Sequence, residues 1–346
     1  MLLFVGPSPG RAGGIATWLR LVLARLGERA PTVPVQHFST DKGGRGALPA
    51  RVARGLVTAA RLDARLRALR PALVHVTCGS GWGLREAGAF ASVARARGAT
   101  VVLHLHAASL FERMDASHFE RTSALLALGR AHRLAVLAPS VIDGLRTRGW
   151  SGRATVVPNG VPLRSAAPAP ADEGPLRLCV LGRPDDPRKG LPDLLGALGR
   201  LPPATRAALD IRWYGAGTAP VPPPGLLFPG PLAPDAVPGA LAEAHALLLC
   251  SRREGLPFVV LEAMAAGRPV LATSVGAVPD LLSRGGWLVR PSDPADLARG
   301  LERLVAQRAQ LPAVGLAARE QVASGWSVDH TLDALRELWA PDVVLP

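Results

Sequence analysis

Short runs of apolar and β-branched residues alternate along this chain with longer Ala/Leu/Arg segments whose apolar positions follow a helical period. Strands that alternate with helices build parallel sheets covered by helices on both faces. Ligands bind such sheets at the carboxyl ends of the strands. The sequence therefore predicts an α/β fold of doubly wound parallel sheets. The runs form two series, at 2–6, 33–39, 72–78, 100–107, 133–140 and 154–160, and at 176–182, 209–215, 225–230, 245–251, 268–274 and 285–290.

A Pro/Ala-rich stretch without a packing pattern separates the two series, which indicates a linker between two domains. The length of 346 residues also exceeds what one hydrophobic core usually serves. We predict two Rossmann-like domains with a ligand cleft between the carboxyl edges of their sheets. The predicted boundaries are 1–162 for the first domain, 163–175 for the linker, 176–326 for the second domain, and 327–346 for a final helix that packs back on the first.

Composition narrows the class of protein. No apolar run reaches the roughly 18 residues of a membrane-spanning helix, and the apolar start without a basic leader is expected to be a first strand rather than a signal peptide. Cys78, Cys179 and Cys250 are widely spaced and predict reduced core thiols, and hence a cytoplasmic location, rather than a metal site. Few aromatic residues lie among the arginines, which argues against specific nucleic-acid binding.

The formal charge of +13 has two readings. Only Lys42 and Lys189 are lysines among 40 basic residues, so the arginine bias can reflect the base composition of the genome. The charge is then an ordinary solvated surface. Alternatively, it attracts phosphates, as in a nucleotide or an anionic lipid surface.

The segment from Arg253 to Val270 places two carboxylates beside an expected helix N-terminus. A turn at Gly255 and Pro257 launches the helix, and Gly267 suits its C-terminal cap. Unpaired N–H groups at such an N-terminus favour phosphate. This predicts an anion site at Gly255, Leu256, Pro257, Phe258 and Val259, with Glu254 just before the turn and Glu262 one turn into the helix. The competing reading is a capping Glu254 and an incidental Glu262.

A second motif, "GRPDDPRKG", begins with Gly182 at a strand end. It supplies the guanidinium of Arg183 and, six residues later, the ammonium of Lys189. Two such cations converging on a diphosphate stabilise both the bound molecule and a leaving group. The neighbouring Arg188 is expected to lie at the surface.

Four blocks in order carry a resemblance to a known family, namely "VLGRPDDPRKG", "WYGAG", "SRREGLPFVVLEAMAAGRPVLATSVGAVPDLL" and "GGWLVRPSDP". The chain resembles retaining glycosyltransferases of the GT-B fold, in particular glycosyltransferase family four. The resemblance implies a UDP- or GDP-sugar donor bound by the second domain and an acceptor bound by the first. It implies that Glu254 contacts the donor sugar and Glu262 the ribose, while Arg183 and Lys189 neutralise the diphosphate without a metal or cofactor.

The resemblance also assigns two places in the first domain. The glycine-rich first loop does not fit a dinucleotide fingerprint, but it matches the family's first loop, in which Gly13 and Gly14 let the backbone approach the donor phosphate or the acceptor. Their other reading is a simple turn. His104 and His106 share one face of a strand and could pair on a metal. By resemblance, His106 instead bonds the donor sugar, and His104 is structural.

The resemblance implies a front-face transfer, and since no carboxylate beneath the sugar stands out in the first domain, we expect no enzyme nucleophile. The resemblance also implies a glycan or polyprenyl-linked acceptor in cell-surface polysaccharide assembly. Basic helices such as 60–70 are expected to lie on an anionic membrane surface or simply to pack on the sheet. The rival functions are a GT-B sugar-nucleotide epimerase and a non-catalytic nucleotide- or polyanion-binding protein.

Overall fold

The computed structural model describes residues 1–11, 13–40, 47–163, 165–168, 170, 173–340 and 342–343. Lys42 and four positions of the linker expected at 163–175 therefore lie outside the described residues. The chain divides into two compact units, which are described separately. Unit 1 comprises residues 1–160 and 328–346, and unit 2 comprises residues 161–327. In the part of the chain that is described, no helix is both long and apolar enough to cross a membrane.

Unit 1 is built on a six-stranded, fully parallel sheet with the strand order β2-β1-β3-β4-β5-β6. β3 is buried at every position because helices cover both faces of a parallel sheet. The strands are β1 (Leu2–Gly6), β2 (Val35–Ser39), β3 (Leu73–Cys78), β4 (Thr100–Leu105), β5 (Arg133–Val136) and β6 (Ala154–Val156).

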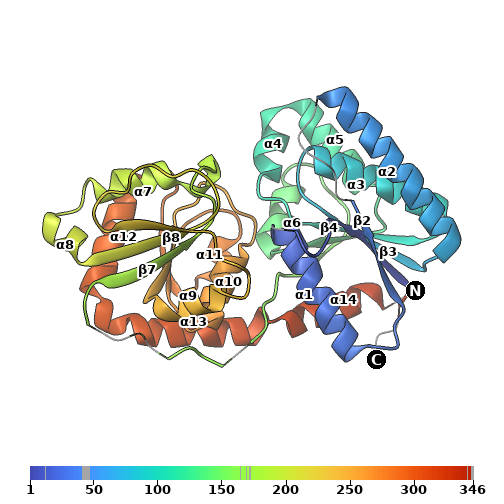
Figure 1. Cartoon of the computed structure of the whole chain (residues 1–346). Coiled ribbons are helices and arrows are strands. Elements are labelled where there is room, and N and C mark those ends of the chain that lie inside the picture. The colour runs from blue at the N-terminus through green and yellow to red at the C-terminus, as the bar shows by residue number, and fades with distance from the viewer. Residues whose placement is uncertain are drawn as a thin grey trace. The chain divides into compact units, whose positions relative to one another are not determined.

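The helices of unit 1 form a layer on each face of this sheet (Figure 1). α3 packs between α2 and α5 on one face, and α1 packs against α14 on the other. The helices are α1 (Gly14–Arg29), α2 (Leu48–Leu69), α3 (Trp82–Ala96), α4 (Leu110–Ala116), α5 (His118–Leu128), α6 (Pro139–Arg146) and α14 (Val328–Trp339).

The last helix, α14, belongs to unit 1 although it follows unit 2 in the sequence. Arg25 of α1 holds Asp329 through two hydrogen bonds of 2.8 and 3.0 Å. Trp339 is fully buried, and beyond it Arg133 donates to Asp342 at 2.6 Å. The chain thus leaves unit 1 after residue 160 and returns to it at residue 328.

Unit 2 contains a second six-stranded parallel sheet, with the order β12-β11-β10-β7-β8-β9. The chain winds from β7 to β9 in one direction and then returns to β10 on the other side of β7. β7 and β10 therefore enclose the topological switch point of a doubly wound sheet. The strands are β7 (Leu176–Leu181), β8 (Leu209–Tyr214), β9 (Leu226–Gly230), β10 (Ala246–Leu249), β11 (Val270–Thr273) and β12 (Gly286–Val289).

Helices also cover both faces of the second sheet. α7 packs against α12 on one face, and α10 packs against α9 and α13 on the other (Figure 1). The helical segments are the 3-10 turn η1 (Pro187–Lys189), α7 (Leu191–Leu198), α8 (Pro203–Ala207), α9 (Val237–Glu243), α10 (Phe258–Ala265), α11 (Val278–Leu281), α12 (Pro294–Ala306), the 3-10 turn η2 (Arg308–Gln310) and α13 (Leu311–Gly325). The two parallel sheets flanked by helices confirm the predicted α/β class.

The stretch expected to be a linker is attached to unit 2 where it is described. Arg268 donates to the carbonyl oxygen of Pro168, and Arg308 donates to that of Gly174 at 2.6 Å. These bonds come from residues 100 and 134 positions away in the sequence, so sequence periodicity could not reveal them.

Candidate functional site

The loops that follow β7 and β10 bring Lys189 and Glu254 together at the switch point of the second sheet. The Nζ atom of Lys189 lies 2.8 Å from Oε1 of Glu254, and the hydroxyl of Ser251 donates to the same oxygen at 2.7 Å. The side chains are 24% and 14% exposed, so this ion pair is partly shielded but reachable from solvent. The two residues are 65 positions apart in the sequence, and both were predicted site residues.

Close packing of the backbone fixes the loop that carries Glu254. A Cβ atom on Gly276 would lie 2.1 Å from the carbonyl oxygen of Glu254, and Gly276 has a φ of +55°. Ala277 also donates its N–H to the carbonyl oxygen of Gly255 at 2.9 Å. The turn after β11 therefore requires glycine, and it packs against the backbone of the loop that carries Glu254.

A half-buried ion pair between Arg252 and Asp193 joins the two site loops. Arg252 donates to both carboxylate oxygens of Asp193 at 2.7 Å, and the Asp193 side chain is only 9% exposed. The N–H of Arg252 also donates to the carbonyl oxygen of Arg188 at 2.7 Å. These contacts join the loop of Glu254 to the segment that carries Lys189. Sequence analysis missed this pair, because no local pattern links residues 59 positions apart.

Lys189 also packs against its own loop. Its aliphatic carbons lie 3.1 Å from the position that a Cβ of Gly182 would occupy, so the lysine stem fills the space beside this glycine. The carbonyl oxygen of Lys189 accepts from the thiol of Cys250 at 3.3 Å. Burial raises the pKa of Cys250 to about 12, so this thiol is unreactive at neutral pH.

The predicted helix after the turn is α10, and its exposure pattern is unusual. Six of its eight residues are buried, and only Val259 and Glu262 are partly exposed. These two residues are three positions apart and share one edge of the helix. Pro257 precedes Phe258, the first helical residue, and the first N–H groups of a helix have no partner within it. Glu262 is thus on the accessible edge, one turn from the N-terminus.

Arg183 does not join this cluster in the structure. Its guanidinium donates to both oxygens of Asp185 at 3.0 and 2.9 Å, and its side chain is 66% exposed. Its contact with a diphosphate stays a prediction. Arg188 is 59% exposed and pairs with Asp186 at 2.6 Å, as the surface assignment of Arg188 expects.

The predicted residues of unit 1 lie at the carboxyl edge of the first sheet. Gly13 and Gly14 begin α1 and are exposed, with no atom within 4 Å of an added Cβ. Gly13 has a φ of +131°, which other residues rarely adopt. His106 directly follows β4, and its N–H donates to the carbonyl oxygen of Cys78 at 2.7 Å.

The ring of His106 packs against Trp18 and His104, with centroid distances of 5.3 and 4.2 Å. Burial, reinforced by the neighbouring His104, holds the pKa of His106 well below its usual range, so this ring is neutral. Within the described residues its Nε2 atom is buried without a hydrogen-bond partner. A neutral imidazole offers one donor and one acceptor, and the buried Nε2 is closed to a ligand from solvent in this structure, so a contact of His106 with the donor sugar stays a prediction.

His104 is fully buried and belongs to a continuous hydrogen-bonded chain. The Nε1 of Trp339 donates to Nδ1 of His75 at 3.1 Å, so the proton of His75 lies on Nε2. That nitrogen faces Nδ1 of His104 at 3.3 Å, and Nε2 of His104 donates to the carbonyl oxygen of Val157 at 3.2 Å. All of these polar atoms are satisfied, which explains His104 as a structural residue.

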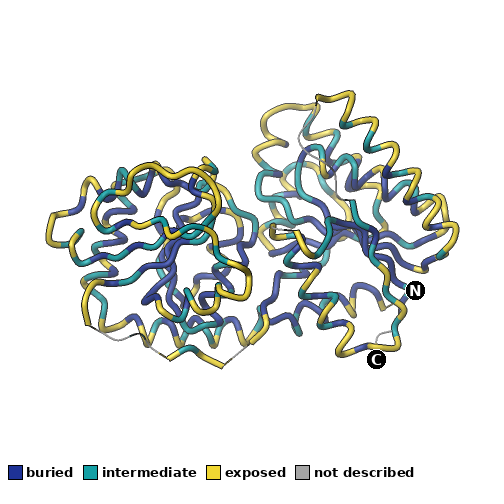
Figure 2. Tube along the Cα trace, in the orientation of Figure 1, coloured by how far each residue is buried: buried dark blue, intermediate teal, exposed yellow. Residues whose placement is uncertain are grey.

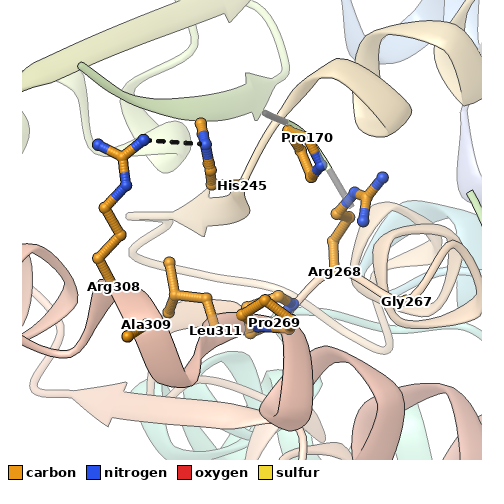
Figure 3. A pocket seen from close by; sticks show the side chains of 9 residues that line it. Pro170, His245, Gly267, Arg268, Pro269, Arg308, Ala309 and Leu311 are labelled. Atoms are coloured by element: carbon orange, nitrogen blue, oxygen red, sulfur yellow. Dashed lines mark hydrogen bonds between the residues drawn. The ribbon is translucent and has the colours of Figure 1, made fainter. Parts of the chain in front are cut away.

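A cavity of about 240 Å³ lies at the opposite edge of the second sheet (Figure 3). His245 and Pro269, which line it, directly precede β10 and β11. Arg268 also lines it and donates to the carbonyl oxygens of Leu241 and Ala242 in α9 at 3.0 and 2.9 Å, which caps that helix. The cavity is therefore separate from the Lys189–Glu254 pair.

No group of three or more His, Cys, Asp or Glu side chains is arranged to hold a metal ion among the residues described. The site offers an anion the ammonium of Lys189 and the first backbone N–H groups of α10. Together with Glu254 and Glu262, they provide one region for a diphosphate and two carboxylates for hydroxyl groups.

Known proteins resemble this chain most clearly in unit 2. Residues 175–307 match the family model described as "Glycosyl transferases group 1". A D-inositol 3-phosphate glycosyltransferase of Nocardiopsis dassonvillei is 40% identical over 96 residues, which are 26% of this chain and 22% of that protein. The 2-deoxystreptamine glucosyltransferase of Streptomyces kanamyceticus is 30% identical over 228 residues, 61% of this chain and 56% of that protein. The chain spans between about a fifth and just over half of the length of the curated relatives it matches.

Solved structures resemble the whole chain. Sucrose-phosphate synthase from Thermosynechococcus elongatus superimposes with a TM-score of 0.77 at 18% identity, covering 98% of both chains. HepE of Anabaena, determined in complex with UDP-glucose, gives a TM-score of 0.71 at 17% identity and covers 98% of this chain and 99% of its own. The chain therefore has the two-domain GT-B fold, and its residues 175–307 carry the sequence pattern of group 1 glycosyl transferases.

Proposed function

We propose that this protein is a retaining glycosyltransferase that moves a sugar from a nucleoside-diphosphate sugar to a glycan or lipid-linked acceptor. The observation that carries the proposal is the Lys189–Glu254 pair, 2.8 Å apart, at the switch point of the second sheet. Doubly wound sheets bind nucleotides at this point. The match of residues 175–307 to group 1 glycosyl transferases and the UDP-glucose complex of HepE support a nucleotide-sugar donor.

In this proposal, unit 2 binds the donor. Lys189 and the first N–H groups of α10 bind the diphosphate, Glu262 accepts from the ribose hydroxyls, and Glu254 accepts from the sugar hydroxyls. The donor base is uridine or guanosine. Arg183 also binds the diphosphate once its guanidinium leaves Asp185. The side chain is 66% exposed, so it is free to make this movement. In unit 1, the neutral ring of His106 binds the donor sugar, and the backbone at Gly13 and Gly14 approaches the donor phosphate or the acceptor.

The proposed chemistry is a front-face substitution. The bond between the anomeric carbon and the diphosphate oxygen breaks, and the acceptor oxygen bonds to that carbon from the same face. The acceptor proton passes to the departing phosphate oxygen. Lys189 and the α10 N-terminus stabilise the negative charge that develops on the diphosphate, so we propose that no metal is required.

The proposed setting is the cytoplasmic assembly of cell-surface polysaccharide, with the acceptor presented at the inner face of the membrane. The net charge of +13 supports an anionic surface as a partner.

The test is sugar transfer from a panel of UDP- and GDP-sugars to a lipid extract and to glycan acceptors. Lys189→Ala is compared with Arg188→Ala, which removes the neighbouring exposed cation. We expect product with retained anomeric configuration in the presence of EDTA. We also expect a loss of about 10²–10³-fold in turnover for Lys189→Ala and little change for Arg188→Ala. Equal rates in both variants contradict the site. Isomerised donor without acceptor indicates an epimerase, and donor binding without turnover under every acceptor indicates a non-catalytic binding protein.

A further inference from the structure

The helix α2 presents an apolar face to solvent. Its exposed large residues are Leu48, Val52, Leu56 and Val57, at 60, 42, 67 and 60% exposure. Leu48, Val52 and Leu56 recur at intervals of four, so they form one stripe along the helix. The other exposed apolar residues of α2 are Pro49, Ala50, Ala53, Ala60, Ala64 and Ala68. A surface helix normally exposes charges instead, so the apolar character of the exposed positions of α2, which are yellow in Figure 2, requires an explanation.

The charged residues of α2 border this face and are of one sign where they are exposed. Arg61, Arg65 and Arg67 are exposed, and no exposed residue of α2 is acidic. Arg61 lies over the ring of Phe38 at 5.9 Å, and Arg51 lies over the ring of Trp82 at 4.7 Å. Arg51 and Arg61 thus lean against the body of unit 1, while Arg65 donates to Gln36 at 3.0 Å and Arg67 pairs with Asp63 at 2.7 Å. The outer face is apolar from Leu48 to Val57, and the exposed arginines of the C-terminal half can exchange their present contacts for lipid phosphates. Apolar area bordered by arginine is the pattern of helices that lie at the surface of anionic membranes.

The net charge of the protein is concentrated in the same unit. Unit 1 contains 23 Lys and Arg against 12 Asp and Glu, a formal charge of +11, whereas unit 2 contains 17 against 15, a charge of +2. Base composition acts on both halves of a gene, so it does not explain a difference of this size. Attraction of unit 1 to an anionic surface does explain it.

The apolar face begins at the carboxyl edge of the first sheet, the edge where parallel sheets bind their ligands. Leu48 begins the helix that follows β2, and Arg51 stacks on Trp82, the first residue of α3 after β3. The exposed end of α2 is therefore beside the carboxyl ends of β2 and β3. Glu86 of α3 lies 3.2 Å from the position that a Cβ of Gly55 would take, so the inner side of α2 is packed closely.

We infer that the outer face of α2 is a docking surface for an anionic lipid bilayer, in which Leu48, Val52, Leu56 and Val57 enter the headgroup region and Arg61, Arg65 and Arg67 contact lipid phosphates. No helix within the described residues can span the bilayer, so the protein lies on the surface through this face. The inference depends on unit 1 alone and does not require that the protein transfer sugar.

The experiment is flotation of the whole protein with vesicles of phosphatidylcholine, with and without phosphatidylglycerol, at low and high salt. Leu56→Glu is compared with Leu316→Glu, which alters a leucine of 58% exposure on α13 in unit 2 and serves as the matched control. Arg61→Gln combined with Arg65→Gln tests the charge. Thermal melting shows whether each variant is folded. We expect all of them to fold, because the substituted side chains are exposed.

We expect binding to vesicles with phosphatidylglycerol and weak binding without it. We expect Leu56→Glu to lower the bound fraction about tenfold, the double arginine variant to abolish the lipid preference, and Leu316→Glu to bind like the wild type. Absence of wild-type binding at low salt, or equal binding of Leu56→Glu and wild type, overturns the inference. Self-association that Leu56→Glu abolishes, without vesicle binding, also overturns it and assigns the face to a second copy of the chain.

Discussion

Among single residues, Glu254 is the most constrained member of the candidate site. Three groups act on it, because Lys189 and Ser251 contact its Oε1 and Gly276 packs against its backbone. A carboxylate that is already held by an ammonium is fixed in position before any ligand arrives, which lowers the entropy cost of binding. In the free protein Lys189 contacts Glu254. In our proposal it also contacts the diphosphate when the donor binds.

Glu254→Gln tests the charge of this carboxylate while it preserves the shape of the side chain. We expect turnover to fall by about 10²-fold or more, because the amide no longer orients Lys189 and accepts sugar hydroxyls less strongly. We expect the melting temperature to change little, since the pair is partly exposed. Initial rates at saturating donor measure the effect. Turnover equal to that of the wild type would remove Glu254 from the site.

Arg252 and Asp193 are expected to act through position rather than through contact with the donor. Arg252→Leu leaves the carboxylate of Asp193 buried without its partner. Such a change typically lowers the free energy of unfolding by about 1–3 kcal/mol. We expect a raised KM for the donor, because the loops of Lys189 and Glu254 lose their side-chain link and keep only the backbone hydrogen bond from Arg252 to Arg188. Arg252→Lys should recover part of the affinity, and the double variant Arg252→Leu/Asp193→Leu should be more stable than Arg252→Leu. Chemical denaturation and steady-state kinetics measure the two effects, and an unchanged KM in Arg252→Leu argues against the positioning role.

At the scale of elements, the buried histidines join α14 to the centre of the first sheet. Trp339 of α14, His75 of β3, His104 of β4 and Val157 after β6 form one hydrogen-bonded chain. Burial lowers the pKa of His104 to about 3 and holds the pKa values of His75 and His106 well below their usual range. A polar chain of this kind is stable only while every ring is neutral.

These pKa values predict that unit 1 loses stability in mild acid. The histidines have lower pKa values in the folded state than the value near 6.5 of the unfolded state, so below about pH 6.5 the unfolded state takes up protons that the folded state does not, for His104 down to about pH 3. Each histidine should lower the free energy of unfolding by about 1.4 kcal/mol between pH 7.5 and pH 5.5. Urea unfolding followed by near-UV circular dichroism measures this, since Trp18 and Trp339 pack on these rings. The same free energy at both pH values would contradict the burial of neutral rings.

At the scale of the whole molecule, unit 1 is discontinuous in sequence. Its core requires the last helix, because Val328, Leu332, Leu335, Leu338 and Trp339 are buried in it. Each buried aliphatic or aromatic side chain that is removed typically costs about 2–5 kcal/mol, and a whole domain is stabilised by only about 5–15 kcal/mol.

Deletion of residues 328–346 is therefore expected to unfold unit 1 and leave unit 2 folded. Differential scanning calorimetry should show that one transition disappears while the other keeps its midpoint. A control deletion of residues 344–346 ends the chain beyond Trp339 and should leave both transitions. Two intact transitions after the larger deletion would show that α14 is not part of the core of unit 1.

Sequence periodicity predicted the strands and α10, because buried parallel strands and a helix after a Gly/Pro turn leave local patterns. The two sequence motifs identified Lys189 and Glu254 as site residues, but they did not predict that the two side chains are in contact. The Arg252–Asp193 pair, the support from Gly276 and the chain from Trp339 to Val157 depend on strand order and on long sequence separations, which periodicity does not encode. For α2, the sequence offered its basic half at 60–70 as a membrane-facing helix or an ordinary packed one, but the exposed apolar residues from Leu48 to Val57 could be identified only from burial.

The central claim is that the Lys189–Glu254 region binds a nucleoside-diphosphate sugar, and thermal unfolding with a panel of UDP- and GDP-sugars tests it most directly. A donor at 100 times its Kd stabilises the folded state by about 2.7 kcal/mol, which raises the Tm of a domain of this size by several degrees. We predict this rise for the wild type and for Arg188→Ala, and its loss for Lys189→Ala. No shift with any of these donors, or an equal shift in Lys189→Ala, would contradict the account.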